Sequence, residues 1–519
     1  MKKRRRRRGG SAARHALRAA TNKEKPSPIR AGVSGGQYKP LSDHEVQRIH
    51  ETALDVLAKI GMGTPIPELV ELATAKGCWL NDKGRLCFPN AFIEEIIAGA
   101  ANEFVLYGAD PKHDLQIAKQ QVHFGTGGAA ISVLDFKSGT YRDSTLIDLY
   151  DFTRLSDQLD NVHWFTRSVI ATELSDPLEL DINTAYVLVT GTKKHIGTAI
   201  TEAENVAPVT ELFDIVAGGE GKFKERPFCK LHTSPIVPPL RYGADASYTI
   251  LEAIKHGWPI NAITAGQSGA TSPATLAGTL VQTHAETLAA LAMVNLFAPG
   301  HPVIFSNWPF VADLRTGAMT GGSTEGGLLN AASAQLINSL DLPSGVAGGM
   351  PDSKIPDAQA GYESALPNLM SGLSGANLIY ESSGMLASLL SCSFEAFVID
   401  DEIIGSVLRA IRGIEITDET LSFDVIAQAV EGAGHFLGAE QTLSVMESEY
   451  FYPVLGNRAT PAQWQEEGGK DMWQNARERV VQLMQNYPNY LTPKQDQTIR
   501  QRFDIKIGLQ QMSRASGRW

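Results

Sequence analysis

Eight short apolar runs, separated by stretches typical of helices, limit the fold of this chain more than any other feature. The runs begin at Gln121, Val162, Lys194, Pro227, Pro259, Pro302, Ser344 and Ala376. The helical stretches between them include residues 144–158, 203–216, 244–256, 274–296 and 326–340. Alternating strands and helices form parallel βα units, and eight such units close a barrel. We therefore predict an α/β fold with a (β/α)8 TIM barrel.

The sequence on either side of these runs predicts helical additions. Ser42 and Glu45 form a capping box that begins a helix, and Gly61 ends it. Residues 422–441 and 464–487 are also typical of helices. We predict a disordered basic tail at residues 1–37, an N-terminal helical cap at 38–118, the barrel at 119–415 and a C-terminal helical extension at 416–519.

Composition excludes several classes of protein. The 519 residues are 43% apolar and 20% charged, and the net charge of −11 argues against a nucleic-acid binder. No apolar run reaches the roughly 18 residues needed to cross a bilayer, so no membrane segment is expected. The four cysteines form no CxxC pair, which is typical of buried thiols in a cytoplasmic protein. The basic run Arg4 to Arg8 reads as a solvated tail, with contact to an acidic partner or to RNA as the alternative.

Motifs for metals, phosphates and nucleophilic serine are missing. There is no H-E-x-x-H sequence, no P-loop and no G-x-S-x-G elbow, and a G-x-G-x-x-G pattern fails at Ala130. We therefore predict no metal site.

The ends of the eight runs indicate where an active site would lie. In most runs the apolar part comes first and the polar or glycine part last, and TIM-barrel active sites lie at the carboxyl ends of the strands. Alternation along the second run predicts that Phe165 and Arg167 share one face while Trp164 points outward. The predicted substrate-binding residues are Phe124, Phe165, Arg167, His232, Gln267, Trp308 and Tyr380, and the predicted catalytic residues are Gly349, Met350 and Glu381. Packing in a loop is the alternative role for each of them.

Three segments carry a resemblance to a known family. Residues 342–363 read LPSGVAGGMPDSKIPDAQAGYE, residues 373–403 read LSGANLIYESSGMLASLLSCSFEAFVIDDEI, and residues 272–288 read SPATLAGTLVQTHAETL. In this order they resemble the trimethylamine methyltransferase family, from about residue 41 to about residue 485. The resemblance implies a (β/α)8 barrel with a substrate pocket at its mouth and a corrinoid protein as methyl acceptor. The chain lacks the D-x-H-x-x-G corrinoid motif, so the corrinoid (cobalamin) is expected on a partner and not bound tightly here.

The sequence departs from the best-known family members at one position. Those members carry pyrrolysine just after the VAG turn, where this chain has Gly349 and Met350. The resemblance then implies a member without pyrrolysine, whose donors are glycine betaine and similar quaternary amines. A quaternary ammonium leaves as a neutral amine, so it needs no activating acid or metal. Near these motifs, Asp352 joins the predicted catalytic residues and Tyr362 the predicted aromatic cage.

These arguments predict an enzyme that moves a methyl group from a small quaternary amine, glycine betaine favoured, to the Co(I) corrinoid of a partner protein. Arg167, Lys230 or His232 would pair with a carboxylate on such a donor. A homo-oligomer is expected. The alternatives are trimethylamine or another methylated amine as donor, an inactive betaine-binding homologue, and a different TIM-barrel enzyme such as a lyase or hydrolase.

Overall fold

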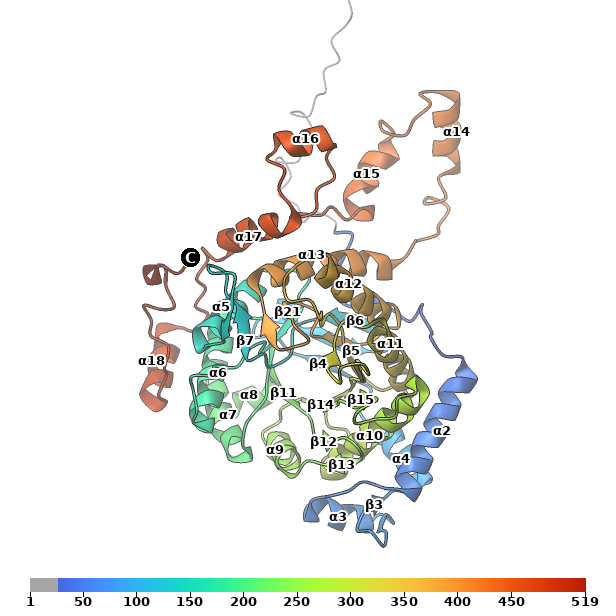
Figure 1. Ribbon diagram of the computed structural model, residues 1–519, viewed down its shortest axis with the longest axis vertical. Coiled ribbons are helices and arrows are strands. Elements are labelled where there is room, and N and C mark those ends of the chain that lie inside the picture. Colours follow the sequence, from blue (N-terminus) through green and yellow to red (C-terminus); the bar gives the residue numbers. More distant parts are fainter. Residues whose placement is uncertain (1–26) are drawn as a thin grey trace, which may run out of the picture. The chain divides into compact units, whose positions relative to one another are not determined.

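Eight parallel strands form one curled sheet in the computed structural model, which describes residues 27–519 (Figure 1). The strands are β6 (Gln121–Phe124), β9 (Trp164–Thr166), β10 (His195–Thr198), β11 (Cys229–Thr233), β14 (Ile260–Thr264), β16 (Val303–Asn307), β19 (Ser344–Ala347) and β20 (Leu378–Tyr380). Each predicted apolar run contains one of them, which confirms the α/β class. Strands buried on both faces read as continuous apolar runs, and this explains why they were visible in the sequence.

The two ends of this sheet approach each other. The order of pairing runs from β6 through β20, β19, β16, β14, β11 and β10 to β9. Gly125, just after β6, forms a parallel bridge with Trp164 of β9. The backbone N–H of His163 also donates to the carbonyl oxygen of Phe124 over 2.8 Å. Hydrogen bonds therefore link the first strand to the last.

Helices surround the sheet (Figure 1). One main helix follows each strand: α5 (Leu146–Ser156), α6 (Pro177–Gly191), α7 (Val206–Ala217), α9 (Ala244–Lys255), α10 (Leu276–Phe297), α11 (Thr324–Asn338), α12 (Ala358–Leu373) and α13 (Phe394–Arg412). A short α8 (Lys222–Glu225) follows α7. The five helical stretches predicted between runs coincide with α5, α7, α9, α10 and α11.

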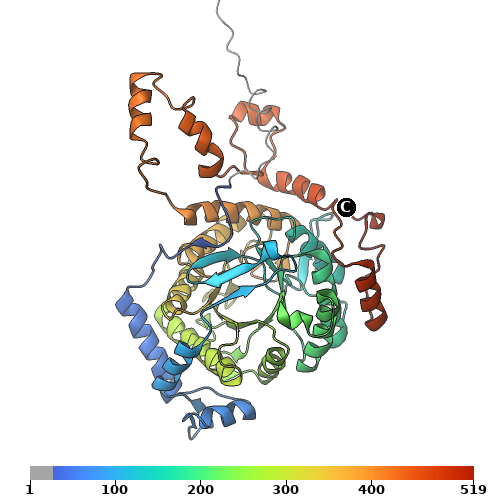
Figure 2. The same ribbon diagram turned by 180° about the vertical axis from the view of Figure 1, so that it is seen from behind.

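The segment before β6 contains helices and two hairpins. The helices are α2 (Asp43–Lys59), α3 (Pro67–Thr74) and α4 (Asn90–Gly99), and the hairpins pair β2 (Trp79–Leu80) with β3 (Leu86–Cys87) and β4 (Glu103–Leu106) with β5 (Leu115–Ala118). The predicted Ser42–Glu45 capping box is present. Leu106 and Ile117 of the second hairpin join the interior cluster of the curled sheet. Seen from behind, this hairpin crosses the ring (light blue in Figure 2), so it closes the amino-terminal end of the sheet.

Part of the predicted disordered tail forms a strand. The tail was predicted at residues 1–37, and residues 1–26 of it lie outside the described residues. The remainder of that range contains β1 (Val33–Ser34), which pairs antiparallel with β6. A two-residue strand has too little pattern to be found from sequence, and it depends on the exposed edge of β6.

Small sheets lie above the carboxyl ends of the parallel strands. One joins β7 (Ser132–Leu134), β8 (Tyr141–Asp143), β21 (Met385–Leu386) and β22 (Ser391–Cys392), and another joins β15 (Gln267–Ser268), β17 (Phe310–Ala312) and β18 (Met319–Thr320). A third pairs β12 (Ile236–Val237) with β13 (Arg241–Tyr242).

The predicted C-terminal extension at 416–519 is divided between two units. Residues 30–413 and 453–519 form one unit, and residues 414–452 belong to the other. The first unit includes α16 (Pro461–Glu466), α17 (Met472–Leu483) and α18 (Pro493–Arg502). Buried Arg154 of α5 donates to the carbonyl oxygens of Met484 and Asn486, which holds this part of the extension against the helices. The second unit contains α14 (Phe423–Glu431) and α15 (Glu440–Glu449).

Candidate active site

Aromatic side chains fill the interior of the curled sheet near the carboxyl ends of its strands. The ring of Tyr380 lies 5.3 Å from that of Trp164 and 5.1 Å from that of Trp308, measured between centroids. The His232 ring lies 5.5 Å from Trp308 and 5.6 Å from Tyr380. Met350 is buried in the same cluster. The structure therefore brings together four predicted site residues, and adds Trp164, which the alternation argument had pointed outward.

Three glycines make room for this cluster. A Cβ atom on Gly125 would overlap the Trp164 ring, and one on Gly345 would overlap the hydroxyl of Ser306. A Cβ atom on Gly197 would lie against Thr166 and 3.2 Å from the Nζ atom of Lys230. The large interior side chains therefore depend on neighbours that have no side chain.

Lys230 lies in this cluster with its charge unpaired. The side chain is fully buried, and its Nζ atom lies 5.3 Å from the centre of the Trp164 ring and 5.5 Å from that of Tyr380. It makes no hydrogen bond to any residue in the described part of the chain. Burial lowers the pKa of Lys230 to about 7. Buried Lys194 is different, because its Nζ atom donates to three backbone carbonyls.

Two cationic groups lie near His232. Burial, together with the nearby charges of Lys230 and Arg167, lowers the pKa of His232 to about 3. The Nδ1 atom of His232 is 3.1 Å from the Nδ2 atom of Asn261, so the ring is held as a neutral group. Burial also lowers the pKa of Arg167, which the Asp181 carboxylate partly opposes. This end of the interior is thus basic, although the chain as a whole is acidic.

Several buried polar atoms in this region have no hydrogen-bond partner within residues 27–519. They are the indole nitrogens of Trp164 and Trp308, the hydroxyl of Tyr380, Nε of Arg167, Nζ of Lys230 and both carboxylate oxygens of Glu381. Buried polar groups in proteins are nearly always paired, because each unpaired group costs about 1–3 kcal/mol. Such a concentration at the carboxyl ends of parallel strands is typical of a site that a polar ligand completes.

Glu381 follows β20 and adopts a left-handed backbone conformation, with a φ of 59°. Its side chain is fully buried, with the carboxylate against the Gly127–Gly128 backbone. A Cβ atom on Gly127 would lie 2.6 Å from Oε1, and one on Gly128 would lie 3.0 Å from Oε2. Burial raises the pKa of Glu381 to about 8. A strained, neutral carboxyl group at a strand end fits a functional role better than a structural one.

The residues after β19 have different surroundings. Met350 points into the aromatic cluster, whereas a Cβ atom on Gly349 would meet Ser364 and Asn368 of α12. Asp352 accepts hydrogen bonds from the backbone N–H of Gly321 and from Ser388. The sequence left open which residue replaces pyrrolysine, and Met350 is the one whose side chain reaches the interior. Asp352 instead joins the loop after β19 to the loops that contain Gly321 and Ser388.

Three predicted substrate-binding residues lie away from the aromatic cluster, and a fourth lies at its border. Phe124 is buried with its ring tip near Gly372 of α12, so it packs between sheet and helices. Phe165 alternates with interior Trp164 and faces the same helical layer. Tyr362 lies on α12 with 55% of its surface exposed, and its ring has no contact with the aromatic cluster in the described chain.

Gln267 is half-buried in β15, where it pairs with Phe310 at the border of the cluster. In a strand that is buried on both faces, alternation does not tell which face is inside.

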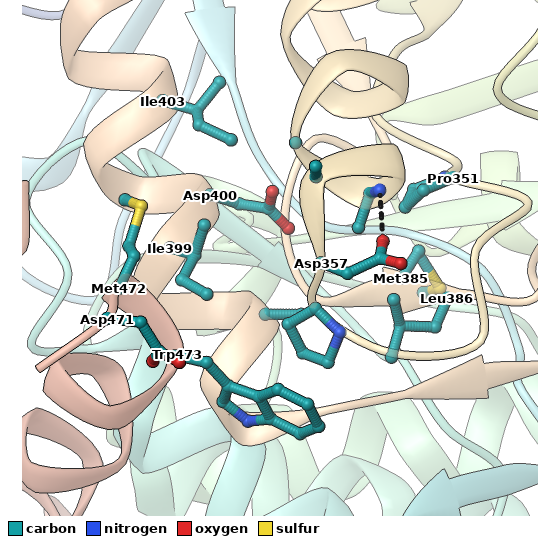
Figure 3. Close-up of a pocket in the computed structure, with 15 residues that line it drawn as sticks. Pro351, Asp357, Met385, Leu386, Ile399, Asp400, Ile403, Asp471, Met472 and Trp473 are labelled. Atoms are coloured by element: carbon teal, nitrogen blue, oxygen red, sulfur yellow. Dashed lines mark hydrogen bonds between the residues drawn. The ribbon is translucent and has the colours of Figure 1, made fainter.

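A separate pocket of about 490 Å³ lies between α12, α13 and the start of α17 (Figure 3). Apolar side chains such as Met385, Ile399 and Trp473 line it, together with Asp357, Asp400 and Asp471. The Asp400 carboxylate accepts hydrogen bonds from Ser364 and from the backbone N–H of Gly384, and burial raises the pKa of Asp400 to about 7. The carboxylates in this pocket already cap helices or hold loops.

The described residues show neither a metal site nor a membrane helix. From residue 27 to residue 519, no group of three or more His, Cys, Asp or Glu side chains is placed to bind a metal ion. In the same span, no helix combines the length and the apolar character needed to cross a membrane.

Comparisons with known proteins give consistent results. A family model described as trimethylamine methyltransferase (MTTB) matches residues 6–506. The trimethylamine methyltransferase MttB of Desulfitobacterium hafniense (strain DSM 10664 / DCB-2) is 34% identical over 479 residues, covering 91% of this chain and 96% of that protein. The glycine betaine methyltransferase of Desulfitobacterium hafniense (strain Y51) is 30% identical over 468 residues, covering 89% of this chain and 95% of that protein. The crystal structure of the Methanosarcina barkeri monomethylamine methyltransferase (MtmB) covers 87% of this chain and 95% of that chain, with 16% identity and a TM-score of 0.46.

Proposed function

The chain belongs to the trimethylamine methyltransferase family, and from this premise we propose that it demethylates a small quaternary amine that carries a carboxylate. Glycine betaine is the favoured donor, and the Co(I) atom of a corrinoid on a partner protein is the acceptor. We take the curled sheet to be a closed (β/α)8 barrel with this site at its mouth, because hydrogen bonds link β6 to β9. A cytoplasmic homo-oligomer is part of the proposal.

The observation that carries the proposal is the unpaired Lys230 among aromatic rings. A betaine has a carboxylate and a trimethylammonium group a few ångströms apart. The carboxylate would pair with Lys230 and Arg167, because Nζ of Lys230 and Nε of Arg167 lack hydrogen-bond partners in the described structure. The faces of Trp308 and Tyr380 would hold the methylated cation, at about 0.5–2 kcal/mol for each ring. One relative is named a glycine betaine methyltransferase, which agrees with this choice.

The reaction is a displacement at a methyl carbon. The electron pair of Co(I) forms the new carbon–cobalt bond while the carbon–nitrogen bond breaks, and nitrogen keeps its pair. The leaving group is a neutral tertiary amine, so this step needs no proton. Trimethylamine itself would leave as an amide anion unless it were first activated, and no pyrrolysine is present for that purpose. The protein then has to position the donor and exclude water.

Glu381 has a role that fits this scheme. With a pKa of about 8, it is mostly neutral near pH 7 and does not compete with the donor carboxylate for the two cations. The Met350 side chain, at the position after Gly349, supplies an apolar wall in place of pyrrolysine. This wall suits the methyl groups of a quaternary amine, which cannot donate hydrogen bonds.

The test is anaerobic methyl transfer to cob(I)alamin, followed by absorbance. Glycine betaine, a carboxylate-free quaternary amine such as tetramethylammonium, and trimethylamine are supplied in separate reactions. We expect methylcobalamin from glycine betaine or a related betaine and none from trimethylamine. Transfer from trimethylamine alone would contradict the proposal. Isothermal titration with the same compounds supplies a readout of donor binding that does not depend on the acceptor.

A further inference from the structure

Residues 414–452, named the acidic arm here, display an unusual amount of apolar surface. Every residue of α14 and α15 is at least partly exposed. Thirty large apolar side chains are exposed among the described residues, and eleven of them lie in these 39 residues. Phe423 and Leu437 are 80% and 82% exposed. Patches of this kind mark interaction surfaces in folded proteins.

The charge of the arm indicates what kind of partner it accepts. Its sequence contains eight Asp or Glu residues and no Lys or Arg. If the arms of two copies met face to face, like charges would oppose each other across the interface, which is unfavourable. The arm therefore requires a partner that is strongly basic and also carries small apolar side chains.

The chain contains one segment with this composition. Residues 1–26 include eleven Lys or Arg residues and one acid, giving +10 against −8 for the arm. Alanines and Leu17 are interspersed with the basic residues from position 12 to position 20. We propose that the acidic arm is the docking surface for the Arg-rich segment at residues 1–26.

This docking is a charge-driven interaction with an apolar contribution. Blocks of like charge such as Arg4 to Arg8 repel one another and commonly act as binding tails. Arg residues suit the task because each guanidinium can form two parallel hydrogen bonds with a carboxylate while its planar face packs on apolar surface. Salt should weaken the contact, since about 0.15 M salt screens exposed charges beyond about 8 Å. The proposal is independent of the methyl donor.

The experiment uses the full chain and two readouts. Carbodiimide joins an amine to a carboxylate only when the two are in contact, so cross-linking followed by mass spectrometry reports the neighbours of Lys2 and Lys3. Hydrogen exchange of residues 423–431 reports whether the arm is covered. We expect cross-links from these lysines to arm carboxylates, lost at 0.5 M NaCl. We also expect exchange at α14 to become at least tenfold faster when Arg4 to Arg8 are replaced by Ser.

Matched variants distinguish an effect of the acidic arm from an effect of negative charge anywhere on the surface. Neutralising Glu415, Asp418, Glu419 and Asp424 should abolish the cross-links. Neutralising four exposed acids elsewhere, Glu71, Asp82, Glu95 and Glu202, should leave them intact. Equal loss with both sets, or unchanged exchange at α14 in the Arg-to-Ser variant, would overturn the proposal. So would cross-links that join the arm to the sheet unit of a second copy, because another surface would then cover it.

Discussion

Replacing Lys230 with Met tests the reasoning about the site most directly. Burial lowers the pKa of Lys230 from 10.5 to about 7, a difference of 3.5 units. At about 1.36 kcal/mol per unit, the buried site disfavours the charged amine by at most about 4.8 kcal/mol. A carboxylate bound next to the charged amine would offset part of this free-energy penalty. Losing one partner of a buried charged pair costs about 2–5 kcal/mol, so we expect Lys230→Met to weaken glycine betaine binding at least about 30-fold.

The pH dependence of donor binding follows from the same shift in the pKa of Lys230. The donor carboxylate binds the charged amine, and above pH 7 that amine has to take up a proton first. Wild-type affinity should therefore fall as pH rises above about 7, up to tenfold per unit, whereas the Lys230→Met variant should lose this component. Glu381 titrates near pH 8, so both chains are compared in a Glu381→Gln background. Isothermal titration in buffers of different ionisation enthalpy counts the proton taken up.

Controls separate this effect from misfolding. The folded chain holds fewer protons on Lys230 than the unfolded chain between pH 7 and 10.5, so wild-type stability rises across that window. The Lys230→Met variant lacks this rise and should be the more stable protein below pH 7. Lys194→Met should instead destabilise, because three carbonyls lose their donor. Tetramethylammonium, without a carboxylate, should bind the Lys230→Met variant no more weakly than wild type. Unchanged glycine betaine affinity in that variant would refute the argument.

Three further outcomes are expected. Glu381→Gln should raise the melting temperature at pH 8 but not at pH 4.5. The pKa of Glu381 in the folded chain, about 8, lies above its usual value of 4.5. The contribution of Glu381 to wild-type stability is therefore complete below pH 4.5 and falls by at most about 4.8 kcal/mol on the way to pH 8. Equal shifts of the melting temperature at both pH values would contradict this. Tyr362→Ala should leave donor affinity within twofold by titration, because the ring is exposed, and a tenfold loss would return this residue to the site. Gly125→Ala should cost about 1–3 kcal/mol of stability in melting experiments by crowding Trp164, whereas Gly361→Ala, in open space on α12, should cost nothing.

The fold was readable from the sequence because its strands are short, apolar and regularly interrupted. All eight runs contain strands, and the capping box at Ser42 begins α2 as expected. The two-residue β1 and the division of the C-terminal extension were not readable. Both depend on contacts between distant segments, and such contacts leave no periodic pattern in the sequence.

The site was only partly readable. The rule that functional residues follow strand ends located His232, Trp308, Met350 and Tyr380, which the structure places in one cluster. The same rule failed where a strand is buried on both faces, because Trp164 and Phe165 look alike in sequence and face opposite sides. The rule also could not single out Lys230, because the sequence does not distinguish a buried, unpaired lysine from a lysine at the surface.

The interior glycines have a consequence for how this enzyme can change over evolutionary time. Gly125, Gly197 and Gly345 already have the smallest side chain, so mutation at these three positions can only reduce the space in the interior. A lineage that adapts to a bulkier donor therefore has to shorten a large residue such as Met350 or Trp308. A saturation library should show the three glycines as intolerant positions and the large residues as the places where new substrate ranges arise.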